Sequence, residues 1–399
     1  MAYKTSQNVD IYIEEEQAGQ IPFSPAPRAQ RYVSTSLEGS YQTIENDTLF
    51  PGRNPEKSLR GTESNAGDLV VNFAPHEHDD FLKAVLCSVD GFVRNAALSD
   101  TLHDVYDMVL GNKQRSFYLE KAFTQDPALY HLFQNLQFST ASISFAISAL
   151  VKITFGLMGS NNPKFETTPP VDLSNALPPL ENEQFFTLQG SAKFQGPDDP
   201  QPVEYIDYVS ITVDISNNMA DLQGLFQLKA IDKTIGMLNI TGTISEYVKD
   251  GKLYNLAKEG KGGTLYITVY NDEAEYTFIL KISFDNSTLS GDQQLQTALP
   301  FKTYGADRFI LRKSVPRIPV TGVALDQSAL SMTVGDYETL TATVSPANAT
   351  NQNVIWTSDD DGVAAVAGGV VEAVGAGTCT ITATTEEGGH TGTCSITVS

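Results

Sequence analysis

Few side chains in this sequence have the types and spacing that metal binding would require. The densest cluster is HEHDD at 76–80, in which His76, His78 and Asp80 are potential ligands of a divalent metal. Because residues two apart on a helix point to different sides, the favoured interpretation is a solvated helix start. The acidic run SDDDG at 358–362 lacks the alternating spacing and the distal glutamate of a calcium loop, so it indicates a turn. The sequence therefore predicts no metal site.

Patterns for nucleophilic and phosphate-transfer chemistry are also missing. The sequence contains no HExxH, GxSxG or GxxxxGKS/T, and the VGAGTC run around Gly375 and Gly377 lacks the third glycine of a dinucleotide fingerprint. Scattered carboxylates leave a glycosidase pair open, because the fold and not the chain spacing sets the distance between them. We predict a protein that is not an enzyme and uses no cofactor.

Three cysteines, Cys87, Cys379 and Cys394, occur without a CxxC pair. If Ile381 and Ile396 face the interior, Cys379 and Cys394 face it too, because side chains alternate along a strand. The amino terminus has no basic and apolar leader, so we expect the protein to fold where it is made. A reducing compartment favours two buried thiols over the alternative, a disulfide.

The chain of 399 residues is strongly acidic, with 48 acidic and 26 basic residues and a net charge of −22. Nucleic-acid affinity comes mainly from Lys and Arg that release counterions, so this balance argues against tightly bound DNA or RNA. The most apolar stretch, 139–159, alternates with period two. It predicts one long half-buried strand, or two strands meeting at a bulge, and not a membrane helix.

Alternation of apolar and polar residues recurs further along the chain and predicts a mainly β protein. It runs through 208–215, 237–248, 264–270 and 275–284. Separated by turn chemistry such as SNNMADLQG at 216–224, these segments describe antiparallel sheets with one covered face. Two short helices are expected at 75–89 and 250–260.

Residues 314–319 are expected to form a short linker, because their two prolines resist both helix and central strand. The linker coincides with a change in composition. Residues 1–317 hold 39 acidic and 26 basic residues, whereas 318–399 hold 9 acidic and no basic residues. We therefore predict two domains, at 1–313 and 320–399.

The second of these domains resembles the group 2 bacterial immunoglobulin-like family. The resemblance rests on the opening VTGVALDQ, the VIWTSDD strand, VVEAVGAGTCTITA and the closing TCSITV. It implies a β-sandwich of short strands. The core residues that it implies are Leu325, Leu340, Val344, Trp356, Ile381 and Ile396. In function the family is diverse, with members that act as adhesin spacers, phage surface decorations and weak sugar binders.

The first domain resembles the major tail tube proteins of long-tailed bacteriophages. The similarity lies in 31–88, with two strands around a long loop before an acidic helix start, in 238–284, and in GADRFILRKS at 305–314. It implies a β-sandwich or barrel with one or two short helices, in hexameric rings stacked into a tube whose lumen conducts viral DNA without binding it specifically. An outward immunoglobulin-like domain would collide with a contractile sheath, so we expect a non-contractile, siphophage-type tail.

The same resemblance implies the partners. These are further copies of the chain and the tail terminator, tail tip and tape measure proteins, with host-surface glycans as a candidate ligand of the immunoglobulin-like domain. No membrane partner is expected. The implied location is the virion tail, after assembly in the bacterial cytoplasm. A capsid or tail decoration protein and a carbohydrate-binding adhesin are the alternative functions.

The loop at 45–63 is a candidate contact between rings. Arg53, Lys57 and Arg60 concentrate positive charge there in an otherwise acidic protein. Acidic subunits repel one another, so a basic loop would favour their contact. The alternative is a solvated loop without a partner.

Overall fold

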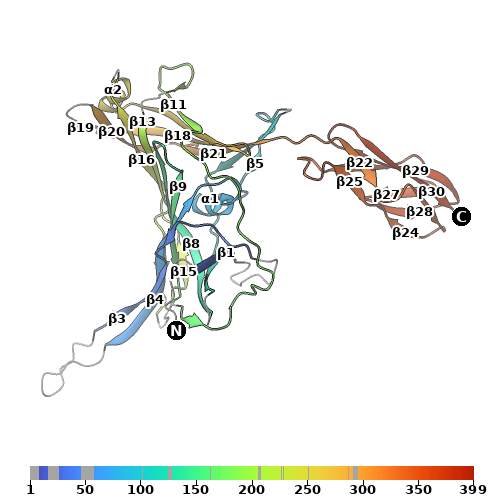
Figure 1. The fold of residues 1–399 in the computed structure, drawn as a ribbon, viewed down its shortest axis with the longest axis horizontal. Helices are drawn as coiled ribbons and strands as arrows, with labels where there is room; N and C mark the ends of the chain where they lie inside the picture. Colours follow the sequence, from blue (N-terminus) through green and yellow to red (C-terminus); the bar gives the residue numbers. More distant parts are fainter. Residues whose placement is uncertain are drawn as a thin grey trace. The chain divides into compact units, whose positions relative to one another are not determined.

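A computed structural model describes residues 9–16, 27–45, 58–100, 102–124, 128–161, 163–204, 208–225, 227, 229–249, 251–285, 287–290 and 295–399. The chain divides into two compact units, the first with residues 1–95 and 105–314 and the second with residues 96–104 and 315–399. Both units are built mainly of β-strands (Figure 1).

In chain order, the elements up to residue 247 are β1 (Val9–Glu15), β2 (Ser34–Thr35), β3 (Glu38–Ile44), β4 (Leu59–Asn72), α1 (Asp79–Val85), β5 (Val93–Arg94), β6 (His103–Val109), β7 (Phe117–Phe123), β8 (Leu129–Ala146), β9 (Lys152–Gly159), β10 (Phe165–Glu166), β11 (Gly190–Gln195), β12 (Val203–Glu204), β13 (Tyr208–Ser216), β14 (Ala220–Leu222), β15 (Asp232–Thr234) and β16 (Asn239–Tyr247). They continue with α2 (Lys252–Lys258), β17 (Gly262–Tyr270), β18 (Glu275–Phe284), β19 (Thr288–Ser290), β20 (Gln296–Thr303) and β21 (Phe309–Pro316). The remaining strands are β22 (Gly322–Leu325), β23 (Ala329–Met332), β24 (Tyr337–Thr339), β25 (Ala342–Ser345), β26 (Val354–Ser358), β27 (Ala364–Ala367), β28 (Val370–Ala373), β29 (Gly377–Thr385) and β30 (Thr391–Val398).

Strand β8, at 18 residues, organises the first unit because it belongs to two sheets (Figure 1). Its first half pairs with β7, beyond which lies β1. Its second half pairs with β9 on one edge and with β13 on the other. The change of partner occurs near Asn135, which has a φ of 53°, and at a register shift between Phe138 and Thr140. Irregularities of this kind re-aim a strand, so one strand serves both sheets.

From β8 the larger sheet extends in two directions. On one side it runs through β13, β16, β20 and β18 to β17 and β11, and on the other through β9 to β4 and β3. The four segments with predicted alternation are confirmed as the antiparallel strands β13, β16, β17 and β18. Strand β11 pairs with β17 along its length but with β12 only at Lys193 and Phe194.

The long strand expected at 139–159 is instead a hairpin, so both versions of that prediction were wrong. Strands β8 and β9 pair Ser144 with Lys152 and Ile143 with Ile153, and the chain turns at Ser148, which has a φ of 52°. Paired residues have the same parity, so both strands keep their odd-numbered side chains on the buried face. The period-two pattern therefore continues across the turn and hides it.

Both helices are shorter than expected because residues with a positive φ lie next to their ends. Helix α1 was expected over 75–89, but it begins at Asp79, after His76 with a φ of 64°, and ends before Cys87 with a φ of 48°. An α-helix cannot contain such residues without cost. Helix α2 lies likewise between two left-handed glycines, Gly251 and Gly260.

Aromatic side chains fill the core of the first unit and hold α1 in place. Phe81 of α1 stacks on Phe138 of β8 with ring centroids 5.1 Å apart, and it meets Phe155 of β9 at 5.7 Å. Phe73 packs edge-on against Tyr276 of β18 at 5.0 Å. Because aromatic pairs add to the energy of apolar burial, these contacts fix the helix on the sheet. The amino end of α1 is thereby brought to β18.

The second unit consists of small sheets packed face to face. Strands β23, β30, β29 and β26 form one sheet, β24, β28 and β27 form another, and β22 pairs with β25. Buried side chains from β23, β28, β29 and β30 meet in one cluster. The unit is therefore a β-sandwich, as predicted.

The two cysteines of the second unit are buried and free. In the pairing of β29 with β30, Cys379 lies opposite Ile396 and Cys394 lies opposite Ile381, so the cysteines are diagonal neighbours. Diagonal neighbours in a sheet are about 7–8 Å apart. A disulfide requires Cα atoms no more than about 7 Å apart. The register therefore favours thiols.

We predict that no thiol of the native protein reacts quickly with a chromogenic disulfide reagent and that all three react in denaturant. Burial raises the pKa of Cys87, Cys379 and Cys394, and the thiolate is the reactive form. The measurement is a thiol titration with and without denaturant. A single reactive thiol in denaturant would instead reveal a bond between Cys379 and Cys394.

Candidate functional site

A two-stranded arm, formed by β3 and the first half of β4, extends from the larger sheet (Figure 1). Its residues Tyr41, Ile44 and Leu59 are 51%, 49% and 62% exposed. Arg60 lies over the ring of Tyr41 at 4.8 Å and binds Glu63 at 2.7 Å. A two-stranded hairpin with exposed apolar side chains is marginal in water by itself. The arm therefore has the properties of a contact surface.

The predicted contact loop at 45–63 is continuous with this arm. Arg60 lies on β4, whereas Arg53 and Lys57 lie outside the described residues. The structure thus places one of the three predicted cations beside an aromatic ring and a carboxylate. Their joint role in contacts between rings stays a prediction.

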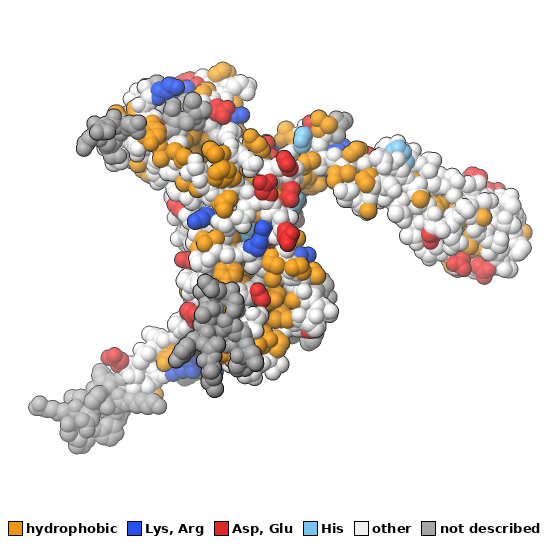
Figure 2. Space-filling view, in the orientation of Figure 1, with side chains coloured by type: hydrophobic (Ala, Val, Ile, Leu, Met, Phe, Trp, Pro, Cys, Tyr) orange, Lys and Arg blue, Asp and Glu red, His pale blue; other side chains and the backbone are white. Residues whose placement is uncertain are grey.

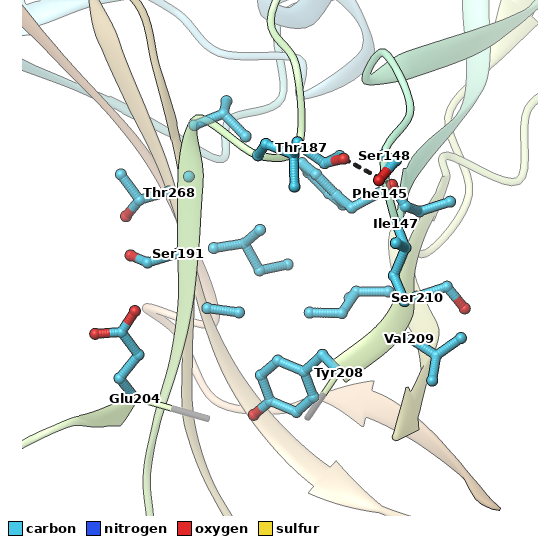
Figure 3. Close-up of a pocket in the computed structure, with 17 residues that line it drawn as sticks. Phe145, Ile147, Ser148, Thr187, Ser191, Glu204, Tyr208, Val209, Ser210 and Thr268 are labelled. Atoms are coloured by element: carbon cyan, nitrogen blue, oxygen red, sulfur yellow. Dashed lines mark hydrogen bonds between the residues drawn. The ribbon is translucent and has the colours of Figure 1, made fainter. Parts of the chain in front are cut away.

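A groove of about 240 Å³ lies where β11 faces the start of β13 and the end of β8 (Figure 3). Figure 3 shows Ser191 and Thr268 on one wall and Tyr208 and Val209 on the other. We call it the β11–β13 groove. Its apolar lining includes Phe145, Ile147, Leu188, Val209, Ile211 and Ile267, and Glu204 contributes a negative charge. Such a groove suits an apolar group flanked by a positive charge.

A short ribbon of β14 and β15 lies in the chain connection between β13 and β16, which pair directly with each other. Leu222, Leu225 and Ile231 at its tip are 49%, 83% and 64% exposed, and we call these three residues the ribbon tip. The ribbon was predicted to be a simple turn at 216–224. The only sign of the ribbon in the sequence is the presence of apolar residues among turn-forming residues. Because these apolar residues show no periodicity, they predict neither the strands nor the exposed side chains.

The HEHDD residues do not converge. The ring of His76 contacts Lys313 of β21, with 2.7 Å between Nδ1 and Nζ. The ring of His78 is buried beside Phe81, and burial lowers its pKa to about 4. Asp80 is exposed at the start of α1. Among the residues that the structure describes, no group of three or more His, Cys, Asp or Glu side chains could hold a metal ion.

Asp79 of this segment takes part in a buried polar network. Lys313, which is 7% exposed, binds the Asp79 carboxylate and lies 5.5 Å from the ring of Tyr276. The Tyr276 hydroxyl donates to Asp79 at 2.7 Å and accepts from the His76 backbone N–H at 3.1 Å. Burial, followed by the Lys313 charge, lowers the pKa of His76. The network joins α1 to β18 and β21. Removal of one partner of such a pair is expected to be strongly destabilising.

Glu120 of β7 is a second buried ionisable residue, and it holds the segment between β10 and β11 through the backbone of Val171. Its side chain is fully buried, and Oε2 accepts from the Val171 backbone N–H at 3.1 Å. Its Oε1 has no hydrogen-bond partner in the described part of the chain. Burial raises the pKa of Glu120 to about 7. The carboxyl is therefore partly protonated near neutral pH.

The predicted core residues of the second unit occupy two clusters. Leu340, Ile381 and Ile396 are buried in the larger cluster, and Leu325 and Trp356 pack against it partly buried. Val344 lies in a smaller cluster with Val320 and Ala349.

The SDDDG run at 358–362 has the contacts of a turn. Asp360 accepts from the Gly362 backbone N–H at 2.9 Å, and Asp359 accepts from the Thr380 backbone N–H at 2.7 Å. Both carboxylates thus satisfy backbone donors, as Asp does in turns. Within the described residues, the helices have 7 residues each, and none has the length and apolarity to span a membrane.

Comparison with known proteins gives a match for each unit. The phage tail tube protein family matches residues 6–303, and the group 2 bacterial Ig-like domain family matches residues 319–396. An Ig-like virion protein of Serratia phage KSP90 is 45% identical over 84 residues, which are 21% of this chain and 33% of that protein. A minor capsid protein of Enterobacteria phage T3 is 43% identical over 84 residues, 21% of this chain and 19% of that protein.

An alpha-L-arabinofuranosidase of Bifidobacterium longum is 47% identical over 73 residues, which are 18% of this chain and 7% of the enzyme. The chain thus spans a third or less of the length of these three relatives.

We predict that Glu120→Gln stabilises the first unit at alkaline pH. Between about pH 4.5 and about pH 7, the folded protein holds a proton at Glu120 that the unfolded chain has lost, so stability falls as pH rises through this window. Glutamine stays neutral and keeps an acceptor for Val171. At about pH 8 the gain should be about 2–3 kcal/mol, and it should vanish below the window.

The measurement is thermal unfolding followed by circular dichroism and by fluorescence. Trp356 is the single tryptophan and belongs to the second unit, so a transition without a fluorescence change reports the first unit. Glu166→Gln, an exposed change on a strand paired with β8, is the control. An unchanged pH dependence in Glu120→Gln would contradict the assignment.

Proposed function

Because the chain belongs to the phage tail tube protein family, we propose that it is the major tail tube subunit of a non-contractile phage tail. In this proposal the first unit forms hexameric rings that stack into a tube, and viral DNA passes through the lumen. The chain is a structural component of the virion and has no enzymatic role. It assembles in the bacterial cytoplasm with the tail terminator, tail tip and tape measure proteins.

The β3–β4 arm is the observation that carries the proposal. Tyr41, Ile44 and Leu59 expose apolar surface on a hairpin that has too few strands to be stable alone. Covering such side chains contributes about 25 cal/mol per Å² of apolar surface. A neighbouring subunit would cover them in a polymer. The arm therefore supports self-assembly.

The acidic charge supports a conducting lumen. Residues 1–317 hold 39 acidic and 26 basic residues, a net charge of −13, which opposes the electrostatic attraction that gives DNA-binding proteins their non-specific affinity for DNA. DNA could then move along the tube without being held. The same charge makes subunits repel, so the contacts between them must bury apolar surface or place cations such as Arg60 at the interface.

The second unit is proposed to project from the outside of the tube. Residues 318–399 contain no Lys or Arg, so this unit offers DNA phosphates no cation. Its similarity to an Ig-like virion protein and to a minor capsid protein favours a surface position. Many weak contacts on one particle could give useful avidity for host glycans.

The similarity to those two virion proteins also favours a second candidate function, a decoration protein of capsid or tail. It covers about a fifth of the chain, whereas the tail tube family matches residues 6–303. A carbohydrate-binding adhesin remains the other alternative. Electron microscopy of the purified protein separates these candidates, because only a tube subunit polymerises into hollow tubes.

We predict that truncation after Arg317 leaves tube formation intact. The cut keeps Arg317, which donates from its backbone N–H to Leu102 at 2.7 Å. Tubes of the same core and smaller outer diameter are expected in negative-stain images. Failure of the truncated chain to assemble, although its first unit unfolds at the same temperature as in the full chain, would place the second unit among the polymer contacts.

We predict that the triple exchange of Arg53, Lys57 and Arg60 to Glu shortens or abolishes tubes without unfolding the subunit. Three reversals add negative charge where rings are proposed to meet, and repulsion raises the concentration needed for stacking. A matched control reverses three exposed lysines elsewhere, Lys152, Lys164 and Lys281. If the triple variant forms tubes of normal length, the loop at 45–63 is not part of the interface between rings.

A further inference from the structure

The ribbon tip and the β11–β13 groove lie at opposite ends of one strand. The groove is lined by Tyr208 and Ile211 at the start of β13, and the ribbon follows Ser216 at its end. At about 3.3 Å per residue, the two features are about 25 Å apart. Figure 1 shows β15 and β11 far apart along the first unit. A chain therefore cannot fill its own groove with its own ribbon tip.

The ribbon is held in place and is not a free arm. Lys229 makes a backbone bridge with Glu63 of β4. The Lys233 ammonium, in a side chain that is 5% exposed, donates to the Asn135 backbone oxygen at 3.2 Å. Gln114 donates to the Lys233 backbone oxygen at 3.2 Å. The ribbon tip is thus presented to solvent from a fixed base, beside the start of the β3–β4 arm.

We propose that the ribbon tip of one subunit inserts into the β11–β13 groove of the next copy of this chain. This inference rests on the proposed function, because it supplies one of the contacts that a tube requires. Leu225, 83% exposed, would bury its side chain against Ile147 and Leu188, which are 56% and 68% exposed at the groove. Each copy would thereby cover the exposed apolar surface of the other.

Charge supports the same pairing. Lys229 is exposed on the ribbon, and Glu204 is the charged residue among those that line the groove. Opposite charges at the rim of an apolar contact select the partner and fix the register. The ribbon of the next copy would bring Lys229 to this carboxylate, and the exposed Asp232 at the start of β15 is the opposing charge on the same ribbon.

The geometry also specifies the kind of assembly. The contact joins two different surfaces of the same chain, so it is heterologous and does not close between two subunits. Repetition of such a contact closes into a ring when the rotation between copies closes and otherwise extends into a stack. The contact therefore fits the ring or the stack of the proposed tube and does not fit a closed dimer.

Cysteine cross-linking tests the contact directly. The native cysteines are buried, so Leu225→Cys and Leu188→Cys would introduce the accessible thiols. Cross-linked dimers are expected under mild oxidation when the two single variants are mixed, and not from either variant alone. Polymers of the mixture without cross-links would overturn the proposed contact.

Charge reversal is the second test. Lys229→Glu and Glu204→Lys should each raise the concentration needed for assembly about threefold to fivefold, because reversing one partner turns an attraction at the rim into repulsion. The chain that carries both exchanges should recover most of the loss. Equal defects in the single and double variants would contradict the pairing of these two residues.

An apolar exchange with a matched control completes the design. Ile147→Glu should block assembly, whereas Ile355→Glu, at the same 56% exposure on the second unit, should not. Circular dichroism checks that both variants fold. If the native chain forms no polymer, the proposed function fails. If it polymerises and Ile147→Glu does so equally well, only the ribbon contact fails.

Discussion

Backbone pairing along β8 is the interaction on which the rest of the first unit depends. A buried strand must have its N–H and C=O groups bonded on both edges. Strand β8 meets this condition by changing partners midway, from β7 and β10 along its first half to β9 and β13 along its second half. Two sheets therefore share one strand, and α1 covers the junction through the stack of Phe81 on Phe138.

The surfaces that this pairing leaves open account for the proposed assembly. Strand β11 has β17 on one edge and only a short pairing with β12 on the other among the described residues. The arm and the ribbon tip add apolar side chains that water does not favour. In a monomer such surfaces invite non-specific association. Because the chain is strongly acidic, charge repulsion between subunits opposes non-specific association. Only contacts with complementary shape then hold two copies together.

The two units use charge differently. The first unit buries charged groups in specific networks, such as Lys313 with Asp79, that fix one element against another. The second unit has no Lys or Arg after Arg317, and Arg317 itself binds Glu387 at 3.3 Å. Its sandwich is held by apolar burial and by Asp side chains that accept from backbone N–H groups in turns. An acidic sandwich of this kind stays soluble at high copy number.

The sequence by itself determined the mainly β character, the two-part composition and the family resemblance of each part. These properties follow from local order, because side-chain alternation is a relation between neighbours along a strand. Tertiary structure alone decided that 139–159 turns at Ser148, that α1 starts only after His76, and that the ribbon and the groove lie at opposite ends of β13. It also joined Lys313 to Asp79, 234 residues apart. The turn at Ser148 keeps odd-numbered side chains on the buried face of both strands, so the period-two pattern does not reveal it. Contacts between distant strands produce no periodic pattern either, and the candidate site therefore depends on long-range pairing that no single stretch of sequence encodes.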